Sequence, residues 1–566
     1  PWAALVCCLT LGVAAWTSAA EEMDEPWSVV PDASASDGPD AIVSDDPYLS
    51  PDGQYVRPVS FQPQPALTPA TEFSPDVALP AAAASLIAES GLATSFLGRP
   101  GAPRRFSPAT SVVYGRLARP RIPTDGGSML LKSPAAVGVG VQRRTPIVND
   151  PRIRGSRIGQ LAASGSYWVP AREDLDTMLS KIDARAIDTI TTIRGPYSAR
   201  YGPGFNFIDV QLLAAPRYAD GDMIEGMTSA DYQTNGEQFY GRQVLTGGNE
   251  RQGYRVGYGH RTGNDYESGN GTDIPSSYKS RDLELAYGLD LTEDQHVNVS
   301  YLRLDQTDVE FPGYAFDLNY LVTDAVDVDY TIEDQAAFDR FDAEFWYNRT
   351  HFNGNAQRTG KRRQFPLFNF FNLTAFTDVD STSTGYRFAS TWGDDETGTL
   401  TAGTDLRYLR QELNELSTGR IGLTIFENAN SPIPKSESPN PGLFAEAQTP
   451  LTERWTVTAG ARADYVAPKM LEDVANLQAL GLAQPQSSLA EILGTDDFDQ
   501  EYGLWAAYLS GAYEIDPHWT ATIAGGHAEQ APTMTEMYAA QTFLFVLQNG
   551  QNTVTGDPRL DNQRLW

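Results

Sequence analysis

The chain has 566 residues, with 73 acidic against 42 basic side chains and a formal net charge of −31. A surface this acidic repels phosphates, which excludes nucleic acid as a partner. Glycine is frequent, aromatic residues make up 11% of the chain, and the mature sequence has no apolar run long enough for a transmembrane helix. Both a soluble α/β enzyme and a β-barrel with alternating strands fit this composition.

The first residues predict export. An apolar run from Ala3 to Trp16 precedes Thr17-Ser18-Ala19-Ala20, the pattern of a signal-peptide core followed by a small-residue cleavage site. We therefore expect residues 1–20 to be a signal peptide whose basic start is missing from this sequence. The two cysteines, Cys7 and Cys8, lie inside this run, so the mature chain is expected to form no disulfide.

Residues 21–136 are predicted to form an extended, disordered arm. Glu21–Ser60 holds ten acidic residues, one basic residue and six prolines, with too few large apolar side chains to fold alone. From Arg99 to Arg157 the charge reverses, with twelve basic residues against two acidic ones. This stretch is either a solvated basic face or a patch attracted to anionic headgroups or an acidic lumen.

Residues 137–215 are predicted to form a small mixed α/β domain. Leu175, Met178, Leu179 and Ile182 have the spacing of one apolar helix face. A β-branched run, Ile190–Ile193, then leads into two tight turns and a second extended apolar segment that ends near Leu213. The turns are Arg194-Gly195-Pro196 and Tyr201-Gly202-Pro203-Gly204.

From residue 221 onward the hydrophobic period becomes two, as in Leu283–Leu291, Val297–Tyr301 and Trp455–Tyr465. Short turns are predicted at Gly248–Arg251, Thr292–Gln295, Gly393–Gly398, Leu451–Arg454 and Ile515–His518. Long polar loops are predicted between them, at Thr307–Asp334, Gln411–Pro441 and Ala467–Gln500. This alternation predicts a mainly β fold, a large antiparallel transmembrane β-barrel over residues 221–566 with about thirteen strands beginning near Met223.

Two regions of the sequence carry a resemblance to a known family. The stretch from Ile190 to Leu213 resembles the end of the plug domain of TonB-dependent outer-membrane receptors, and Val148–Gly155 resembles their first plug strand, which ends in Arg-Gly. Glu529–Tyr538 is similar to the family motif R-A-P-[ST]-x-x-E-[LM]-Y, and Gly556–Leu560 to its companion G-N-P-x-L, with Gln530 and Asp557 as departures. The plug-motif positions are Arg154, Gly155, Arg194, Gly195, Pro196, Ser198, Tyr201 and Gly202. The barrel-motif positions are Ala531, Pro532, Glu536, Tyr538, Gly556, Pro558 and Leu560.

The resemblance implies a receptor that imports a scarce ligand of the siderophore, cobalamin or glycan class when a periplasmic TonB-type protein displaces the plug. The implied partners are that coupling protein, outer-membrane lipid, and a small-molecule or oligosaccharide ligand. Trp27-Ser28-Val29-Val30 and Ser111-Val112-Val113-Tyr114 are candidates for the box that adds to TonB as a strand. More strands follow the second motif pair in this family, so we expect the last strands, roughly nine of about 22, to be missing.

Two other functional classes stay open at this point, an adhesion or scaffold barrel not coupled to TonB and a secreted all-β enzyme. The chain contains no G-x-S-x-G, P-loop, G-x-G-x-x-G or H-E-x-x-H pattern, so we expect neither enzymatic activity nor a cofactor. Its five histidines share no ligand spacing, so no metal site is predicted from them. The acidic stretch Asp324–Asp334 is predicted to be a solvated loop, with a calcium site as the alternative.

Overall fold

The structure is a computed structural model, and every residue that it describes lies in one compact unit, Gly91–Trp566. The described residues are 110–566 with gaps at 120–122, 146, 154–159, 164–165, 168–177, 314–315, 365, 371, 395, 473–475, 479–487, 517–518, 541, 544–551 and 554. The predicted signal peptide, the arm up to residue 109, and the motif residues Arg154 and Gly155 lie outside the described residues.

The first folded part, called here the plug, is a small mixed α/β arrangement. Its five-stranded sheet has the order β1-β6-β7-β4-β5, in which β4 and β7 are parallel and the other neighbours antiparallel. A separate hairpin, β2 with β3, packs against the short helix α4, while the short helix α3 packs on β1 and β6. The elements are β1 (Thr110–Tyr114), α3 (Gly115–Ala118), α4 (Gly126–Lys132), β2 (Val139–Thr145), β3 (Val148–Ile153), β4 (Gln160–Ala163), β5 (Ser166–Tyr167), β6 (Ile187–Ile193) and β7 (Phe207–Leu212).

Local sequence explains the plug elements. Asp125 caps α4 because its carboxylate accepts from the Ser128 amide at 2.8 Å while the Ser128 hydroxyl accepts from the Asp125 amide at 3.0 Å. The β-branched run of β6 is almost entirely buried, and β7 pairs with it as the alternating apolar pattern predicted. Most of the predicted helix around Leu175 lies outside the described residues, although Met178 and Leu179 are buried in the plug core.

The boundary between arm and plug was predicted too late in the chain. Residues 110–119 and 123–132 are not a disordered arm, because β1 pairs with β6 along five residues and α4 is buried in the plug core. The box candidate at Ser111–Tyr114 is this β1 strand, so its backbone is already hydrogen-bonded to the plug. Frequent proline and alanine suggested disorder in this part of the sequence. The short strand β1 within it is not evident from sequence because it forms only by pairing with β6.

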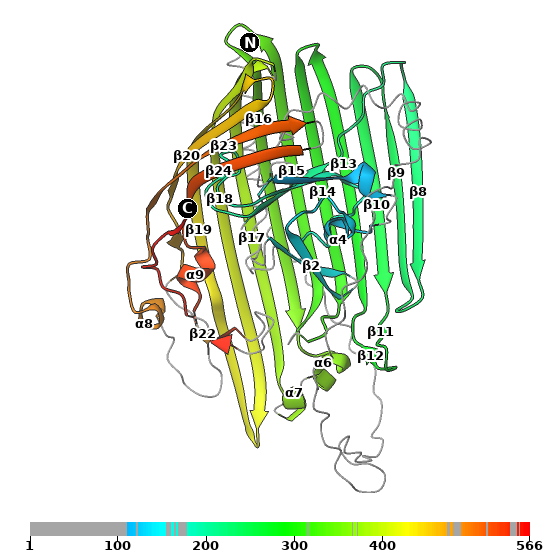
Figure 1. Ribbon diagram of the computed structural model, residues 1–566. Coiled ribbons are helices and arrows are strands. Elements are labelled where there is room, and N and C mark those ends of the chain that lie inside the picture. The colour runs from blue at the N-terminus through cyan, green and yellow to red at the C-terminus, as the bar shows by residue number, and fades with distance from the viewer. Residues whose placement is uncertain are drawn as a thin grey trace, which may run out of the picture. The chain divides into compact units, whose positions relative to one another are not determined.

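The second part is one large antiparallel sheet in which sequence neighbours are spatial neighbours (Figure 1). Thirteen of its described strands have eleven or more residues, which agrees with the predicted number and the start near Met223. They are β8 (Met223–Gln233), β9 (Gln238–Gly248), β10 (Gln252–Gly263), β13 (Tyr278–Thr292), β14 (Gln295–Val309), β15 (Asp317–Gln335), β16 (Phe338–Asn355), β17 (Thr374–Asp394), β18 (Gly398–Ile421), β19 (Thr424–Thr452), β20 (Trp455–Val466), β23 (Tyr502–Asp516) and β24 (Trp519–Gln530).

Short elements decorate one end of this sheet. There β11 (Tyr266–Glu267) pairs with β12 (Asp273–Ile274), while β21 (Lys469–Met470) and β22 (Asn476–Gln478) add to β19. The remaining elements are the helices α6 (Thr359–Gln364), α7 (Pro366–Phe370), α8 (Leu489–Leu493) and α9 (Met534–Tyr538), and the strands β25 (Thr542–Phe543), β26 (Asn552–Thr553) and β27 (Gln563–Leu565). Among the described residues, no helix combines the length and apolarity needed to cross a membrane.

The predicted short turns all lie at the opposite end of the strands, but two of the three predicted long loops are wrong. Residues 317–335 form β15, and residues 411–441 belong to the hairpin of β18 and β19, which turns at Gly422 and Leu423. Both stretches are polar in sequence, yet cross-strand ion pairs such as Asp324 with Arg303, at 2.8 Å, hold their charges in a regular ladder. The prediction failed because a strand that carries many paired charges has the same polar composition as a loop.

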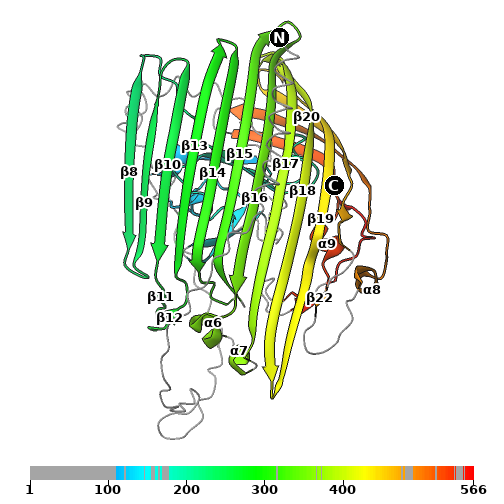
Figure 2. The same cartoon turned by 180° about the vertical axis from the view of Figure 1, so that it is seen from behind.

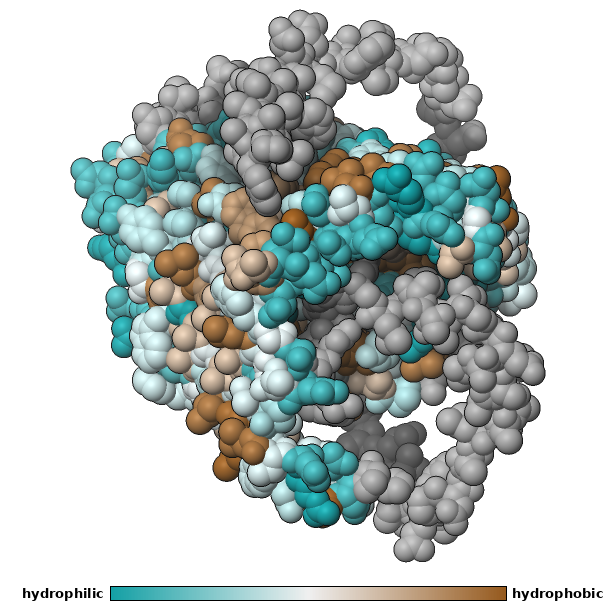
Figure 3. Space-filling view, turned by 90° about the horizontal axis from the view of Figure 1, so that it is seen from above, coloured by the Kyte–Doolittle hydropathy of each residue, from teal (hydrophilic) through white to brown (hydrophobic). Residues whose placement is uncertain are grey.

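The two faces of the large sheet differ. On β13, Leu285 and Tyr287 are 40% and 45% exposed on the outer face, whereas Asp282 and Glu284 are buried on the inner face beside the plug. Figures 1 and 2, seen from opposite sides, place the plug elements on the inner face. In the end view of Figure 3, brown hydrophobic patches interrupt a largely hydrophilic surface.

We expect Ile190→Ala to destabilise the plug, because Ile190 is fully buried at the centre of the plug sheet. The cavity should cost about 2–5 kcal/mol and speed the hydrogen exchange of β6 and β7 amides. Leu117→Ala on α3, where the side chain is 62% exposed, serves as the control and should leave this exchange unchanged. Equal exchange in both variants would contradict the proposed core.

Candidate functional site

The plug motif forms a corner between β6 and β7, residues 194–206. Gly195 and Gly202 adopt positive φ values of 76° and 94°, a region that side chains with a Cβ avoid. Arg194 is buried and donates to the Val137 carbonyl at 2.9 Å, tying the corner to the plug's own hairpin. Ser198 accepts from the Arg200 amide at 3.3 Å. The motif therefore first shapes a sharp, rigid bend.

This bend contacts the wall of the large sheet, a region we call the corner seam. Arg462 of β20 donates to the Ala199 carbonyl at 3.1 Å, and Arg387 of β17 donates to the Arg200 carbonyl at 3.3 Å. In return, Glu446 of β19 accepts from the Ala199 amide at 3.3 Å and pairs with the Arg200 guanidinium at 3.2 Å. Four contacts from three strands thus fix two successive plug residues.

Arg462 is the best-satisfied cation of the corner seam. Its side chain is fully buried and meets Asp405 in a bidentate pair at 2.7 and 2.9 Å and Asp464 in a second at 2.6 and 2.7 Å. Bidentate pairs are strong and directional, and removing one member of a buried ion group typically costs about 3–5 kcal/mol. The carboxylates hold the guanidinium so that one N–H remains directed at the plug backbone.

Gly202 lies where the corner approaches the wall most closely. A Cβ at this position would lie 1.8 Å from the Arg407 Nη1 atom, and Arg407 is itself paired with Asp464 at 3.1 Å. The motif tyrosine before it, Tyr201, donates to the buried carboxylate of Asp209 at 3.1 Å. Burial raises the pKa of Asp209 to about 6, although a hydrogen bond from Gln211 and the charge of Arg387 oppose this shift.

A second group of contacts, the arginine seam, lies on β9, β10 and β13. Arg242 of β9 is completely buried between the plug carboxylate Asp183, at 3.3 Å, and the wall carboxylates Asp282 and Glu284, the latter at 2.8 Å. Arg255 pairs with Glu284 at 2.7 Å and donates to the Arg185 carbonyl of the plug at 3.1 Å. Arg242 therefore neutralises carboxylates from both the plug and the large sheet.

Arg261 extends the arginine seam to the start of α4. It donates to the carbonyls of Ser180 and Lys181 at 3.0 and 3.2 Å and lies 3.5 Å from Asp125, the residue that caps α4. Between the two seams the plug core meets a small apolar patch of Leu302, Leu304 and Ala325. The plug is thus attached to the wall mainly through arginines and backbone carbonyls.

The barrel motif forms a separate cap at the end of the sheet that carries the longer connections. Thr533 and Glu536 make a capping box that starts α9, and the buried Tyr538 donates to the Phe498 carbonyl at 2.7 Å. Gly556 packs under the helix, where a Cβ would lie 2.5 Å from the Met537 backbone, and its amide donates to Ala539 at 2.7 Å. Ala531 and the buried Pro532 precede the helix, Pro558 is buried, and the Leu560 carbonyl accepts from Tyr502 at 2.9 Å.

The motifs found from sequence thus locate the corner seam and the cap, whereas the arginine seam was missed. Of the plug-motif residues, Arg194, Gly195, Ser198 and Tyr201 shape the corner, Gly202 touches the wall and Pro196 packs beside Gly526 of β24. The residues of the large sheet that contact the plug could have been found from only one feature of the sequence. Arg242, Asp282, Glu284, Asp405 and Arg462 are charged at inward positions of strands whose outward positions are apolar.

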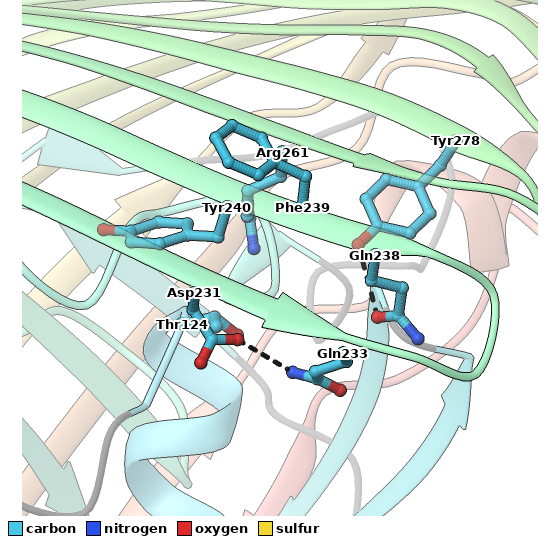
Figure 4. A pocket seen from close by; sticks show the side chains of 8 residues that line it. All are labelled: Thr124, Asp231, Gln233, Gln238, Phe239, Tyr240, Arg261 and Tyr278. Carbon is cyan, nitrogen blue, oxygen red and sulfur yellow. Dashed lines mark hydrogen bonds between the residues drawn. The ribbon is translucent and has the colours of Figure 1, made fainter.

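A polar pocket near the end of β8 and β9 is lined by residues including Asp231, Gln238 and Arg261 (Figure 4), and hydrogen bonds join Gln233 to Asp231 and Tyr278 to Gln238. Within the described ranges, no three metal-ligating side chains gather. The acidic stretch Asp324–Asp334 is part of β15 rather than a loop, with Asp324 and Glu333 paired to arginines.

Comparison with known proteins decides the family. Residues 181–566 match the family model described as "TonB dependent receptor-like, beta-barrel", which is more than half of the chain. The chain belongs to this family. The family consists of receptors and transporters of the outer membrane, so the large sheet is the wall of an outer-membrane barrel whose outward apolar face meets lipid.

Solved structures of this architecture resemble the chain at low identity. The copper transporter OprC is 20% identical with a TM-score of 0.62, over 76% of this chain and 65% of that one. The Serratia marcescens hemophore receptor HasR, solved with its hemophore HasA and heme, is 15% identical with a TM-score of 0.55, over 81% and 68%. The ferric citrate transporter FecA is 14% identical with a TM-score of 0.53, over 74% and 62%. The chain therefore spans a little under two thirds of OprC, and no curated protein sequence matches it.

We expect Gly202→Ala to loosen the corner seam. The new Cβ meets an unfavourable φ and displaces the Arg407 guanidinium, so the cost should be about 1–3 kcal/mol. Limited proteolysis of the membrane-embedded protein should then cleave the plug faster. Gly140→Ala in β2, where nothing lies within 4 Å of the added Cβ, is the matched control and should cleave at the wild-type rate.

Protonation of the buried Asp209 carboxylate should make the plug more stable in mild acid. Its pKa of about 6 in the folded plug exceeds the ordinary 3.8, so the folded state binds the proton more tightly than the unfolded state. Stability is therefore lowest above pH 6 and rises as pH falls from 6 towards 4, by up to about 3 kcal/mol. Hydrogen exchange of β7 amides, corrected for intrinsic rates, should slow accordingly, and Asp209→Asn should remove this pH dependence. A wild-type profile that is flat over this range would contradict the assignment.

Proposed function

We propose that this receptor imports a scarce ligand across the outer membrane and that TonB-driven displacement of the plug opens the route. The observation that carries the proposal is the chemistry of the two seams. Arginines such as Arg242 and Arg462, together with backbone carbonyls, hold the plug, and apolar contact with the wall is small. Water can solvate charged and carbonyl groups after separation, so such an interface can be opened by force without exposing a large hydrophobic surface.

We place ligand binding at the outer end, on the longer connections and the apex of the plug. Ile147, at the turn between β2 and β3, is buried in a cluster with Tyr278, the first residue of β13, and with Phe316 and Phe368 from the outer connections. A ligand bound over this cluster would touch the plug and the outer loops together. Its arrival could therefore alter how the plug sits in the barrel.

The ligand belongs to the siderophore, cobalamin or glycan class in our proposal. OprC is named as a copper transporter, FecA as a ferric citrate transporter, and HasR was solved with heme. These names favour a metal-containing ligand as the first class to test. The energy-coupling partner is a TonB-type protein, and because β1 is occupied by β6, the segment that it binds is proposed to precede Thr110, with Trp27–Val30 as the candidate.

Deleting Trp27–Val30 should abolish energy-dependent uptake while leaving ligand binding at the cell surface intact, because the box transmits force but does not contact ligand. Uptake and surface binding of labelled ferric siderophores and cobalamin would be measured in cells with and without the inner-membrane energy supply. Deleting Gln62–Pro65, a segment of equal length in the same arm, is the control and should leave uptake unchanged. Surface binding without energy-dependent uptake in the wild type would instead support an adhesion or scaffold barrel.

A further inference from the structure

The inner face of the large sheet carries an excess of negative charge between the plug and the short turns, a region we call the acidic patch. Its six carboxylates lie on β13, β15 and β16 and are Asp290, Asp327, Asp329, Glu333, Asp342 and Glu344. Three arginines pair with them: Arg340, Arg387 and, from the segment between plug and barrel, Arg217. Six carboxylates against three guanidinium groups leave three negative charges, or two when His296, which contacts Asp290, is protonated.

Strand register places the acidic patch in the lumen. Ala325 packs against the plug core, and Asp327 and Asp329 follow it on the same face of β15. Across the sheet, Glu344 of β16 lies opposite Asp329. The Glu344 side chain is 28% exposed and that of Glu333, near the β15–β16 turn, is 37% exposed. The patch is therefore open to water on the side of the short turns.

Two features indicate that a positive charge is needed here. Asp329 and Glu344 lie directly opposite on neighbouring strands, an arrangement of like charges that destabilises a sheet. Asp327 is only 4% exposed, no base of the described chain pairs with it, and its Oδ1 atom has no hydrogen-bond partner. Burying a carboxylate without a partner costs free energy, so a cation bound here would stabilise the barrel.

Neighbouring parts of the wall have no spare positive charge to offer. In the corner seam, Arg200, Arg407 and Arg462 are matched by Glu446, Asp405 and Asp464. The described residues of β4 and β5, the plug strands on the side of β16 and β17, carry no charged side chain. The missing charge must come from elsewhere.

The dimensions of the acidic patch suit an extended chain better than a single ion. From Asp327 to Glu333 the patch follows six residues of β15, about 20 Å. Within the described ranges, no three metal-ligating side chains gather, so one ion would meet too few ligands. Several bases spaced along an extended segment could instead contact the whole patch.

The segment directly before β1 has this spacing. Its bases are Arg99, Arg104 and Arg105, and no acidic residue occurs in positions 90–124. Two prolines between the first two arginines favour an extended backbone. In that conformation the three guanidinium groups are distributed over about 20 Å, which matches the patch in length and in charge.

The segment is also close enough to reach the patch. In the plug sheet, β7 lies two strands from β1, about 10 Å. Asp209 of β7 faces the acidic patch, since the charges of Glu344 and Arg387 both act on it. Arg105, five residues before Thr110, can lie up to about 17 Å from the start of β1.

We propose that Arg99, Arg104 and Arg105 dock on the acidic patch while the plug is seated in the barrel. Guanidinium groups suit this role because they donate paired, directional hydrogen bonds to carboxylates. The docking itself requires neither ligand nor coupling protein. Its consequence rests on the proposed TonB-driven displacement, in which a pull on the arm would break these ion pairs before it strained β1.

The test uses the full-length receptor in detergent, without ligand or coupling protein, and a nitroxide label on the variant Ala102→Cys. Both natural cysteines lie in the predicted signal peptide, so the label reports on this position alone. Electron paramagnetic resonance at low salt should show an immobilised label. Salt at about 1 M should make it mobile, because it screens accessible ion pairs.

Removing charge from either side should release the segment. In Asp327→Asn/Asp329→Asn, and separately in Arg104→Ser/Arg105→Ser, the ratio of immobilised to mobile label should fall at least about fivefold, as for the loss of one accessible ion pair. Glu293→Gln/Asp294→Asn removes the same charge from the exposed turn between β13 and β14 and should keep the wild-type ratio.

Two further controls address folding and unspecific contact. The heat-dependent gel shift of folded barrels must be unchanged in every variant, and a label on Ala70→Cys, outside the basic segment, should be mobile at all salt concentrations. A mobile Ala102→Cys label at low salt, immobilisation that salt does not relieve, or an unchanged ratio in Asp327→Asn/Asp329→Asn would each overturn the proposal. Equal immobilisation at position 70 would do the same.

Discussion

The burial of Arg242 and Arg462 between carboxylates is the constraint on which the rest of the structure depends. Each guanidinium has no access to water, so its charge must be matched in place, by Asp183, Asp282 and Glu284 for Arg242 and by Asp405 and Asp464 for Arg462. These partners come from several strands and, for Arg242, from the plug. The Arg242 group is therefore complete only when plug and barrel are assembled in one register, whereas the Arg462 group fixes the register of the wall strands and directs one N–H at the plug backbone.

A polar boundary suits a plug that must move. Apolar packing would be broken at a cost proportional to the area exposed, whereas buried ion pairs lose part of their stabilisation to desolvation even when intact. The two seams therefore contribute more to fixing the position of the plug in the barrel than to the free energy of unfolding. The corner residues Ala199 and Arg200 illustrate this role in positioning. The wall arginines donate hydrogen bonds to the backbone carbonyls of these two residues and not to their side chains. Side-chain changes at these two positions leave that part of the contact in place.

Local patterns in the sequence predicted the elements whose stability is local. The alternation in Leu283–Leu291 and Trp455–Tyr465, the five short turns, and the two strands that flank the Arg194–Gly204 corner lie in the structure where they were expected. The failures involve segments that depend on partners distant in sequence. Ser111–Tyr114 is a strand because β6 pairs with it. Residues 317–335 and 411–441 are strands because basic side chains, arginines for the first stretch and lysines for the second, pair with their acidic groups across the sheet.

The sequence by itself determined the class of this protein, a plug followed by a barrel wall, because period-two hydrophobicity and glycine corners record local backbone geometry. It also identified Gly202 and the Thr533–Tyr538 segment as special positions, although not what they touch. Only the tertiary structure decided the two seams. Their residues are ordinary charged side chains in sequence, and their roles arise from strand register and plug placement, which bring Asp183 to Arg242 and Asp405 to Arg462 across long stretches of chain. Register follows from the turn geometry and the hydrophobic pattern of all the strands together, so a single stretch of sequence does not show which charges will meet.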